Sequence, residues 1–226
     1  MDDEMASAES GRFLSRVYAW MVFALIVSGV IARWAASNPP VVDLLIGNKF
    51  FFWGMILSEF AIVLALTAAT QKISSQLAVL LFILFSVING FTLSVIFLVF
   101  TPGSIAMVFF ITAGTFAAMS LYGFFTQSDL TSLGNLCLMA LVGFVITALM
   151  NSYYQSEAVS FIGSVAGVLI FVGLIAHDTQ KIKKLNILGN EGTETDRKES
   201  IVGALTLYLD FVNLFLNLLN LFGKKK

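Results

Sequence analysis

The chain has 226 residues, enough for one domain or at most two. Hydrophobic residues make up 58% and charged residues 12%, and the mean hydropathy is +0.90, whereas soluble proteins are about 45–50% apolar and about 25% charged. This composition excludes an ordinary soluble domain and predicts an all-α polytopic membrane protein. The net charge of −1 argues against a nucleic-acid partner. A single cysteine, Cys137, excludes an internal disulfide and a cysteine-built metal site.

The distribution of charged residues locates the membrane spans. No charged residue lies between Lys72 and Asp129, a stretch long enough for two spans of about 20 residues each, with a break at Thr101-Pro102-Gly103. Strands of a barrel would be about ten residues long with alternating polarity, so we expect helices. The sequence predicts a single transmembrane domain over residues 1–226 with seven helices, at about 13–34, 50–70, 76–100, 104–125, 133–151, 158–182 and 201–222.

Charge also indicates how the chain enters the membrane. The first residues are acidic, including Asp2, Asp3 and Glu4, whereas an export signal begins with basic residues, so we expect the first span to be retained. With seven spans, eight basic residues fall on the N-terminal side of the membrane and five on the other, where three of the five are the terminal lysines 224–226. The positive-inside rule therefore predicts a cytoplasmic N-terminus.

Three acidic residues lie inside predicted spans, namely Glu59, Asp178 and Asp210. Charges in a bilayer are costly and indicate functional positions. Glu59 is interpreted as lining a cation path, as pairing with Arg16, or as making a structural hydrogen bond. Arg16 is then either a pairing charge or an anchor that reaches the membrane interface. His177 is given no role, because adjacent residues of a helix point about 100° apart.

The last span carries a polar stripe. Its members recur at spacings of three and four, which place them on one face of a helix; they are Gly203, Thr206, Asp210, Asn213, Asn217 and Asn220. A stripe of this length must face protein or water, so we expect this helix to be packed centrally. Either hydrogen bonds between helices or a cation path along Asn213, Asn217 and Asn220 explains the asparagines. Hydrogen bonding alone explains the carboxylate less well.

The sixth span presents a face of small residues that ends at an aspartate. Ser160, Gly163, Ser164 and Gly167 allow a close helix approach, and Asp178 follows on the same face. At about 1.5 Å per residue, Asp178 and Asp210 differ in depth by about one helical turn, so we expect the two to pair. Two adjacent carboxyl groups share one proton, which makes a pH-sensitive link between helices. The same pair is alternatively a transient calcium site or a static buried contact.

The motifs of most enzyme classes are absent from the sequence. It contains no phosphate-binding glycine loop, no H-E-x-x-H and no G-x-S-x-G, and the last span has no lysine to hold retinal. Intramembrane aspartyl proteases stay open as an alternative, because they place one aspartate on each of two successive helices. In those enzymes the second aspartate follows a G-x-G turn, whereas Asp210 follows Leu207-Tyr208-Leu209. We therefore predict that the chain is not an enzyme.

Two segments resemble the signature of the Bax inhibitor-1 family, also called the transmembrane Bax inhibitor motif proteins. They are His177-Asp178-Thr179-Gln180-Lys181 and the run Gly203-Ala204-Leu205-Thr206-Leu207-Tyr208-Leu209-Asp210-Phe211-Val212-Asn213-Leu214-Phe215. Arg16-Val17-Tyr18-Ala19-Trp20-Met21 and Leu121-Tyr122-Gly123 support the match. The short loops are similar to those of the bacterial branch. One departure is His177, where the family commonly has an aromatic residue such as tyrosine.

This resemblance implies a fold in which six helices wrap a central C-terminal helix. It also implies a pH-sensitive calcium leak channel in the bacterial plasma (inner) membrane, with Asp178 and Asp210 as the gate pair and Glu59 as the acidic residue of the second span. The resemblance implies that calcium is the permeant ion and that membrane lipid surrounds the protein. It implies no tightly bound cofactor. Some bacterial members resemble regulators of a membrane-bound AAA protease instead, and eukaryotic members are linked to suppression of cell death, so a non-transporting regulator stays open as the alternative.

Overall fold

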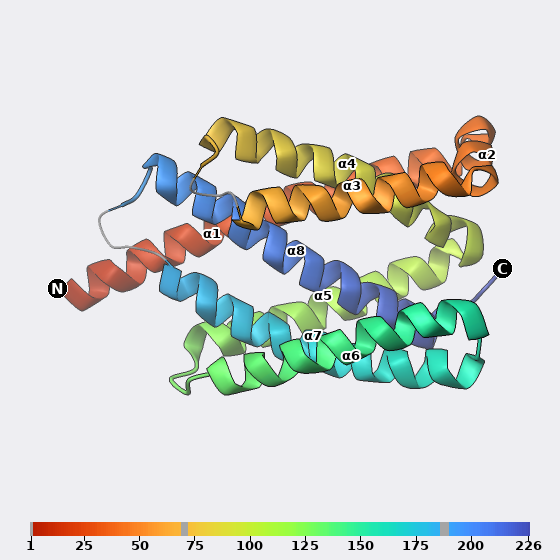
Figure 1. Ribbon diagram of the computed structural model, residues 1–226. Coiled ribbons are helices and arrows are strands. Elements are labelled where there is room, and N and C mark those ends of the chain that lie inside the picture. Colours follow the sequence, from red (N-terminus) through yellow and green to blue (C-terminus); the bar gives the residue numbers. More distant parts are fainter. Residues whose placement is uncertain (1, 69–71, 186–189) are drawn as a thin grey trace. The chain divides into compact units, whose positions relative to one another are not determined.

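The computed structural model describes residues 2–68, 72–185 and 190–226, and almost all of these residues are helical. They form eight helices (Figure 1): α1 (Asp2–Ala36), α2 (Pro39–Gly47), α3 (Lys49–Ala68), α4 (Ser75–Val99), α5 (Pro102–Phe125), α6 (Thr131–Tyr154), α7 (Glu157–Leu185) and α8 (Glu194–Phe222). All except α2 are long and apolar enough to cross a membrane. The predicted all-α polytopic architecture with seven spans is confirmed.

The predicted spans agree best with α4, α5, α6 and α7, whose ends lie within three residues of prediction. The predicted end of the second span at residue 70 lies outside the described residues. Helix α8 begins at Glu194 rather than at 201, because Glu194 and Asp196 in its first turn favour a helix N-terminus. Helix α2 was not predicted, although a proline at its start is a typical helix-initiation signal.

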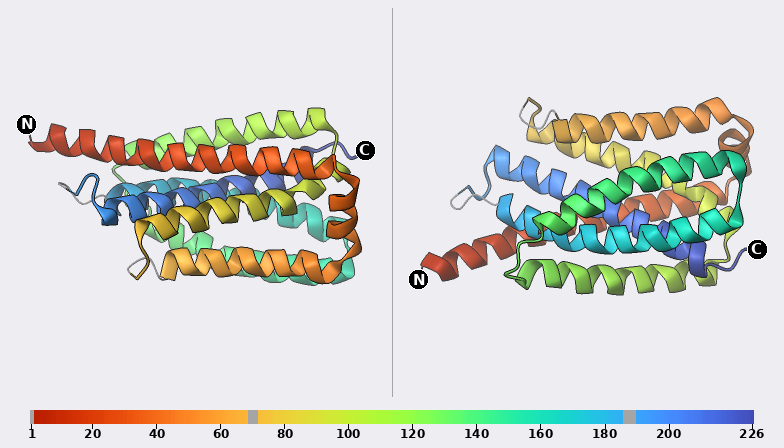
Figure 2. Two further views of the ribbon diagram at one scale, coloured as in Figure 1. Left: turned by 90° about the horizontal axis from the view of Figure 1, so that it is seen from above. Right: turned by 60° about the horizontal axis from the view of Figure 1, so that its bottom comes forward.

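The chain divides into two compact units that share α8. The first unit holds α1–α4 with α8 up to Tyr208, and the second holds α5–α7 with α8 from Leu209. In the first unit α4 packs against both α1 and α3, and the short α2 joins α1 to α3 at one end (Figure 2). In the second unit α7 contacts α5 through Ser120 and Thr179, and α6 through Phe144 and Phe171. The prediction of a single domain is not tested by this division.

Helix α8 is the most buried span. Over an apolar stretch of 18 residues in α8, 72% of the residues are buried. The corresponding share is 39% or less in each of the other six spans. It contacts α1 and α4 through Tyr208 in the first unit, and α5 through Phe211 in the second. A membrane span with this share of buried residues is covered by other helices over most of its surface. These contacts agree with the predicted central packing of α8.

The predicted break at Thr101-Pro102-Gly103 is also confirmed, because α4 ends at Val99 and α5 begins at Pro102. Proline lacks the amide hydrogen that a helix interior requires, so it starts a helix rather than continuing one. The amide of Thr101 donates to the carbonyl of Lys224 at 2.9 Å, and Phe100 and Lys225 form an isolated antiparallel bridge. The break therefore provides backbone groups that hold the segment after α8.

Two glycines of the second unit mark places where helices approach too closely for a side chain. A Cβ on Gly123 of α5 would overlap the backbone carbonyl of Ala176 in α7. A Cβ on Gly167 of α7 would overlap the amide of Asn217 in α8. The second contact confirms that the small-residue face of the sixth span packs against the last span.

We expect Gly123→Ala to lower the free energy of unfolding by about 1–3 kcal/mol, since the added methyl group meets backbone that cannot move without shifting α7. Gly114→Ala on the same helix is the matched control, because a Cβ there has no atom within 4 Å. Thermal unfolding of the detergent-solubilised protein measures both. Equal melting temperatures for the two variants would show that the close approach of α5 and α7 does not contribute to the stability of the fold.

Candidate functional site

Glu59 on α3 is half-buried and held by neutral groups of α4. Its Oε1 accepts a hydrogen bond from Thr92 Oγ1 at 2.9 Å, and its Oε2 accepts one from Asn89 Nδ2 at 3.2 Å. The suggested pairing with Arg16 is wrong, because Arg16 pairs with other carboxylates. No lysine or arginine in the described part of the chain forms an ion pair with Glu59. The carboxyl group is therefore hydrogen-bonded without a compensating positive charge.

A buried hydrogen-bond chain continues from Glu59 to α8. The hydroxyl of Tyr208, which is 0% exposed, donates to Asn89 Oδ1 at 2.7 Å and lies 2.7 Å from Ser28 Oγ of α1. Four helices of the first unit thus meet through polar side chains. Sequence reasoning missed Asn89 and Tyr208, although polar residues at spacing three on α4 (Asn89 and Thr92) could have indicated a buried polar face.

Asp210 is buried in α8, with 5% of its surface exposed. Its Oδ2 atom has no hydrogen-bond partner among residues 2–68, 72–185 and 190–226. The acidic group that acts on it through charge is Asp178 of α7, so the structure brings the two predicted gate residues together in the second unit. A buried polar atom left without a partner is rare in folded proteins and indicates a strained or functional position. Proton sharing between the two carboxyl groups stays a prediction.

His177 belongs to this site, which corrects the sequence analysis. Its Nδ1 lies 2.9 Å from Asp178 Oδ1, and the two side chains are 12% and 14% exposed. Adjacent helix positions do diverge at Cβ, but these two side chains bend toward each other beyond that atom. The imidazole packs on Gly134 of α6, where any Cβ would overlap the ring. Asp178 therefore lies between a histidine and a second carboxyl group.

The asparagines of the polar stripe hydrogen-bond through their amide nitrogens. Asn213 and Asn217 each donate to the backbone carbonyl four residues earlier, at 2.8 Å. Asn220 donates to Ser160 and Ser164 of α7, at 3.0 and 2.7 Å. The Asn220 contacts fit the interhelical hydrogen-bond interpretation, whereas those of Asn213 and Asn217 stay within α8. The predicted cation path along these three residues is not tested by the contacts.

A cavity of about 300 Å³ lies beside the stripe in the second unit, between helices α6, α7 and α8. Apolar groups form part of its wall, and hydroxyl or amide side chains are contributed by Thr147, Asn151, Ser152, Ser160, Ser164 and Asn217. Oxygens of this kind suit hard cations such as calcium. In the described residues no three histidine, cysteine or acidic side chains gather closely enough to hold a metal ion. The transient calcium site at Asp178 and Asp210 therefore stays a prediction.

Arg16 lies in an ion-pair network in the first half of α1. Its Nη2 pairs with Asp196 at 2.8 Å and its Nη1 with Glu191 at 3.0 Å. Arg12 also pairs with Glu191, at 3.1 Å. Hydrogen bonds from Arg12 and then Arg16 hold the pKa of the Glu191 carboxyl below its usual value. Arg16 is thus a pairing charge, but it ties α1 to the segment at the start of α8 rather than to Glu59.

Comparison with known proteins places the whole arrangement in one family. The family model described as "Inhibitor of apoptosis-promoting Bax1" matches residues 11–226. The inner membrane protein YbhL of Escherichia coli is 45% identical over 215 residues, covering 95% of this chain and 92% of that protein. A protein of Borreliella burgdorferi is 41% identical over 215 residues (95% and 93%), and a membrane protein of Streptococcus pyogenes is 34% identical over 231 residues (99% of both). Seven apolar spans and this relationship identify an integral multi-pass protein of the bacterial inner membrane.

We expect Tyr208→Phe to lower the free energy of unfolding by about 1–3 kcal/mol, because it leaves the buried Asn89 oxygen without its donor. Tyr153→Phe removes the same hydroxyl from a side chain that is 84% exposed and serves as the matched control. Melting temperatures of the two variants in the same detergent provide the comparison. If Tyr208→Phe is as stable as the control, the hydrogen-bond chain contributes nothing to folding.

Proposed function

Because the chain belongs to the Bax inhibitor-1 family, we propose that it is a calcium leak channel, not an enzyme, gated by the Asp178–Asp210 pair. The observation that supports this function is a set of carboxyl groups inside the spans without lysine or arginine partners in the described chain. Glu59 has only neutral donors, and Asp210 has an orphaned oxygen facing protein. Purely structural carboxylates in a membrane usually pair with a base, whereas uncompensated ones attract cations.

Glu59 supplies the negative potential on the proposed cation path. Its hydrogen bonds come from the neutral groups of Asn89 and Thr92, which do not cancel a negative charge on the carboxyl group. A cation near the carboxylate therefore has no lysine or arginine ion pair to compete with in the described chain. The amide oxygens of Asn213, Asn217 and Asn220 would provide further weak, neutral ligands, which allow an ion to leave as well as to enter.

The gate consists of the link between α7 and α8. With one proton between them, Asp178 and Asp210 form a charge-assisted hydrogen bond that ties the two helices. Loss of this proton leaves two like charges in a site of low dielectric constant, and a second proton removes the charge assistance. Either change weakens the link, so flux should follow pH. The Nδ1 of His177 lies 2.9 Å from Asp178 Oδ1, so the imidazole adjoins the pair.

Two other functions make different demands on the molecule. A regulator of a membrane-bound AAA protease needs no ion path, and purified protein would then carry no flux. An aspartyl protease needs backbone opened beside its second aspartate, whereas α8 runs as one continuous helix through Leu207–Leu209 and Asp210. Calcium flux into liposomes that contain this protein alone separates transport from regulation. The absence of calcium flux at every pH would overturn the channel function in favour of the regulator.

Glu59→Gln should reduce calcium flux about tenfold without unfolding the protein, since about 1.4 kcal/mol is a typical interaction with one charge at intermediate dielectric. Glu157→Gln removes the same charge from the exposed first turn of α7 and should leave flux unchanged. Both variants are compared in liposomes loaded with a calcium-sensitive dye, at matched protein content. Unchanged flux in Glu59→Gln would assign this residue to the scaffold.

Asp178→Asn and Asp210→Asn should each flatten the pH dependence of flux, because a single carboxyl group has no like-charged partner to split its titration. The double variant should resemble either single variant rather than double the effect. His177→Gln keeps both carboxyl groups, so we expect it to shift the pH response without abolishing it. A wild-type pH response in both aspartate variants would remove the pair from the gate.

A further inference from the structure

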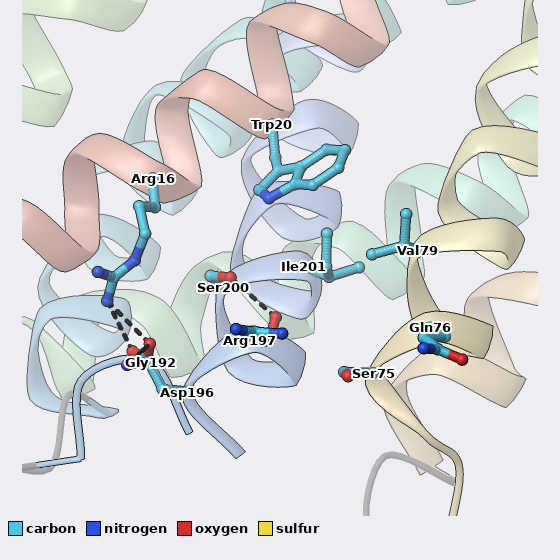
Figure 3. Close-up of a pocket in the computed structure, with 10 residues that line it drawn as sticks. All are labelled: Arg16, Trp20, Ser75, Gln76, Val79, Gly192, Asp196, Arg197, Ser200 and Ile201. Carbon is cyan, nitrogen blue, oxygen red and sulfur yellow. Dashed lines mark hydrogen bonds and ion pairs between the residues drawn. The ribbon is translucent and has the colours of Figure 1, made fainter. Parts of the chain in front are cut away.

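A second cavity, of about 480 Å³, lies in the first unit, away from the carboxyl groups described above. It opens between α1, α4 and the beginning of α8, as Figure 3 shows. Its lining residues are Arg16, Trp20, Ser75, Gln76, Val79, Gly192, Asp196, Arg197, Ser200 and Ile201. In Figure 3 the residues of α4 face those of α1 across the pocket, with Arg197 and Ile201 of α8 between them.

The pocket lies at the depth of the lipid headgroups. Helix α4 has 25 residues, so at about 1.5 Å per residue it extends about 37 Å, against a hydrocarbon core of about 30 Å. Its first turn, with Ser75 and Gln76, therefore projects beyond the hydrocarbon. Val79 is one turn deeper, at the upper edge of the apolar region. Trp20 is a residue type that collects at this boundary.

The lining is polar on one side and apolar on the other. Trp20, Val79 and Ile201 provide the apolar wall, and Trp20 is fixed by edge-on contacts with Phe23 and Phe82. The remaining residues are polar: they include the carboxylate of Asp196, which accepts hydrogen bonds, and the donors of Arg197, Ser75 and Gln76. A soluble anion gains nothing from an apolar wall, whereas a molecule with a charged head and a hydrocarbon body uses both sides.

Among the charged residues that line the pocket, Arg197 is the one without an ion pair in the described chain. Both oxygens of Asp196 accept from Arg16 Nη2, and Oδ2 also accepts from the Gly192 amide. The carboxylate of Glu194, which does not line the pocket, accepts from the Ser75 amide, a neutral group that leaves its charge in place. The guanidinium of Arg197 makes no ion pair or hydrogen bond within the described chain. Guanidinium groups bind phosphate through two parallel hydrogen bonds, so Arg197 fits a phosphate group.

We propose that this pocket binds the phosphate headgroup of a membrane glycerophospholipid. Arg197 holds the phosphate oxygens, Ser75 and Gln76 offer further donors, and the glycerol and first acyl carbons lie against Trp20, Val79 and Ile201. The site includes neither Glu59 nor the aspartate pair, so an experiment can disprove the lipid site without bearing on the channel function. A bound lipid would link α1, α4 and α8 at the membrane surface.

The test uses the full-length protein purified in a maltoside detergent. Dihexanoylphosphatidylglycerol is titrated below its micelle-forming concentration, and the rise in melting temperature gives an apparent affinity. Arg197→Gln should weaken this affinity about tenfold, as expected for the loss of hydrogen bonds to a charged group. Lys198→Gln removes the same charge from the neighbouring residue, which does not line the pocket, and should change the affinity less than about twofold.

Two further arms identify the ligand and its position. Inorganic phosphate at equal concentration should not stabilise the protein, and equal stabilisation would make the pocket a free-anion site and overturn the lipid proposal. Val79→Trp fills the apolar side while keeping every charge, so it should also weaken lipid binding, measured against its own melting temperature. Wild-type affinity in Arg197→Gln or in Val79→Trp would show that the lipid binds elsewhere, and would equally overturn the proposal.

Discussion

The cost of placing polar groups in a membrane determines most of this structure. Helix α8 is strongly apolar except for one polar stripe, and no such stripe can face hydrocarbon without losing hydrogen bonds to water. Other helices must therefore cover it, and α8 becomes the most buried span. The glycines and serines of α7 follow from the same constraint, because only small residues let its backbone approach the asparagine side chains closely enough.

The two acidic sites meet that cost in different ways. Glu59 is surrounded by donors that form a chain through Asn89 to Tyr208, so its charge is solvated by the protein. One oxygen of Asp210, Oδ2, has no hydrogen-bond partner among the described residues, and the group beside it is another acid, Asp178. The two sites therefore differ in their surroundings: neutral donors face Glu59, and a second carboxyl group faces Asp210.

The sequence predicted the parts of this structure that depend on apolar length and helical periodicity. The spans from α4 to α7, the break at Pro102 and the packing face of α8 all follow from those two patterns. Contacts between side chains far apart in sequence could not be predicted in this way. Arg16 pairs with Asp196 rather than Glu59, because its position in the first half of α1 puts it beside the first turn of α8. His177 was missed because helical geometry determines the direction of the Cα–Cβ bond, whereas the position of the imidazole ring also depends on the side-chain torsion angles.

The contact between His177 and Gly134 has an evolutionary consequence. The imidazole occupies the volume that any side chain at position 134 would need, so the two positions form one steric unit across α6 and α7. A larger residue at 134 becomes tolerable only when the ring at 177 is lost or turned away, and turning it away would separate His177 from Asp178. Related sequences should therefore vary at these two positions together, and a relative with a bulky residue at 134 would hold the aspartate at position 178 without an aromatic neighbour.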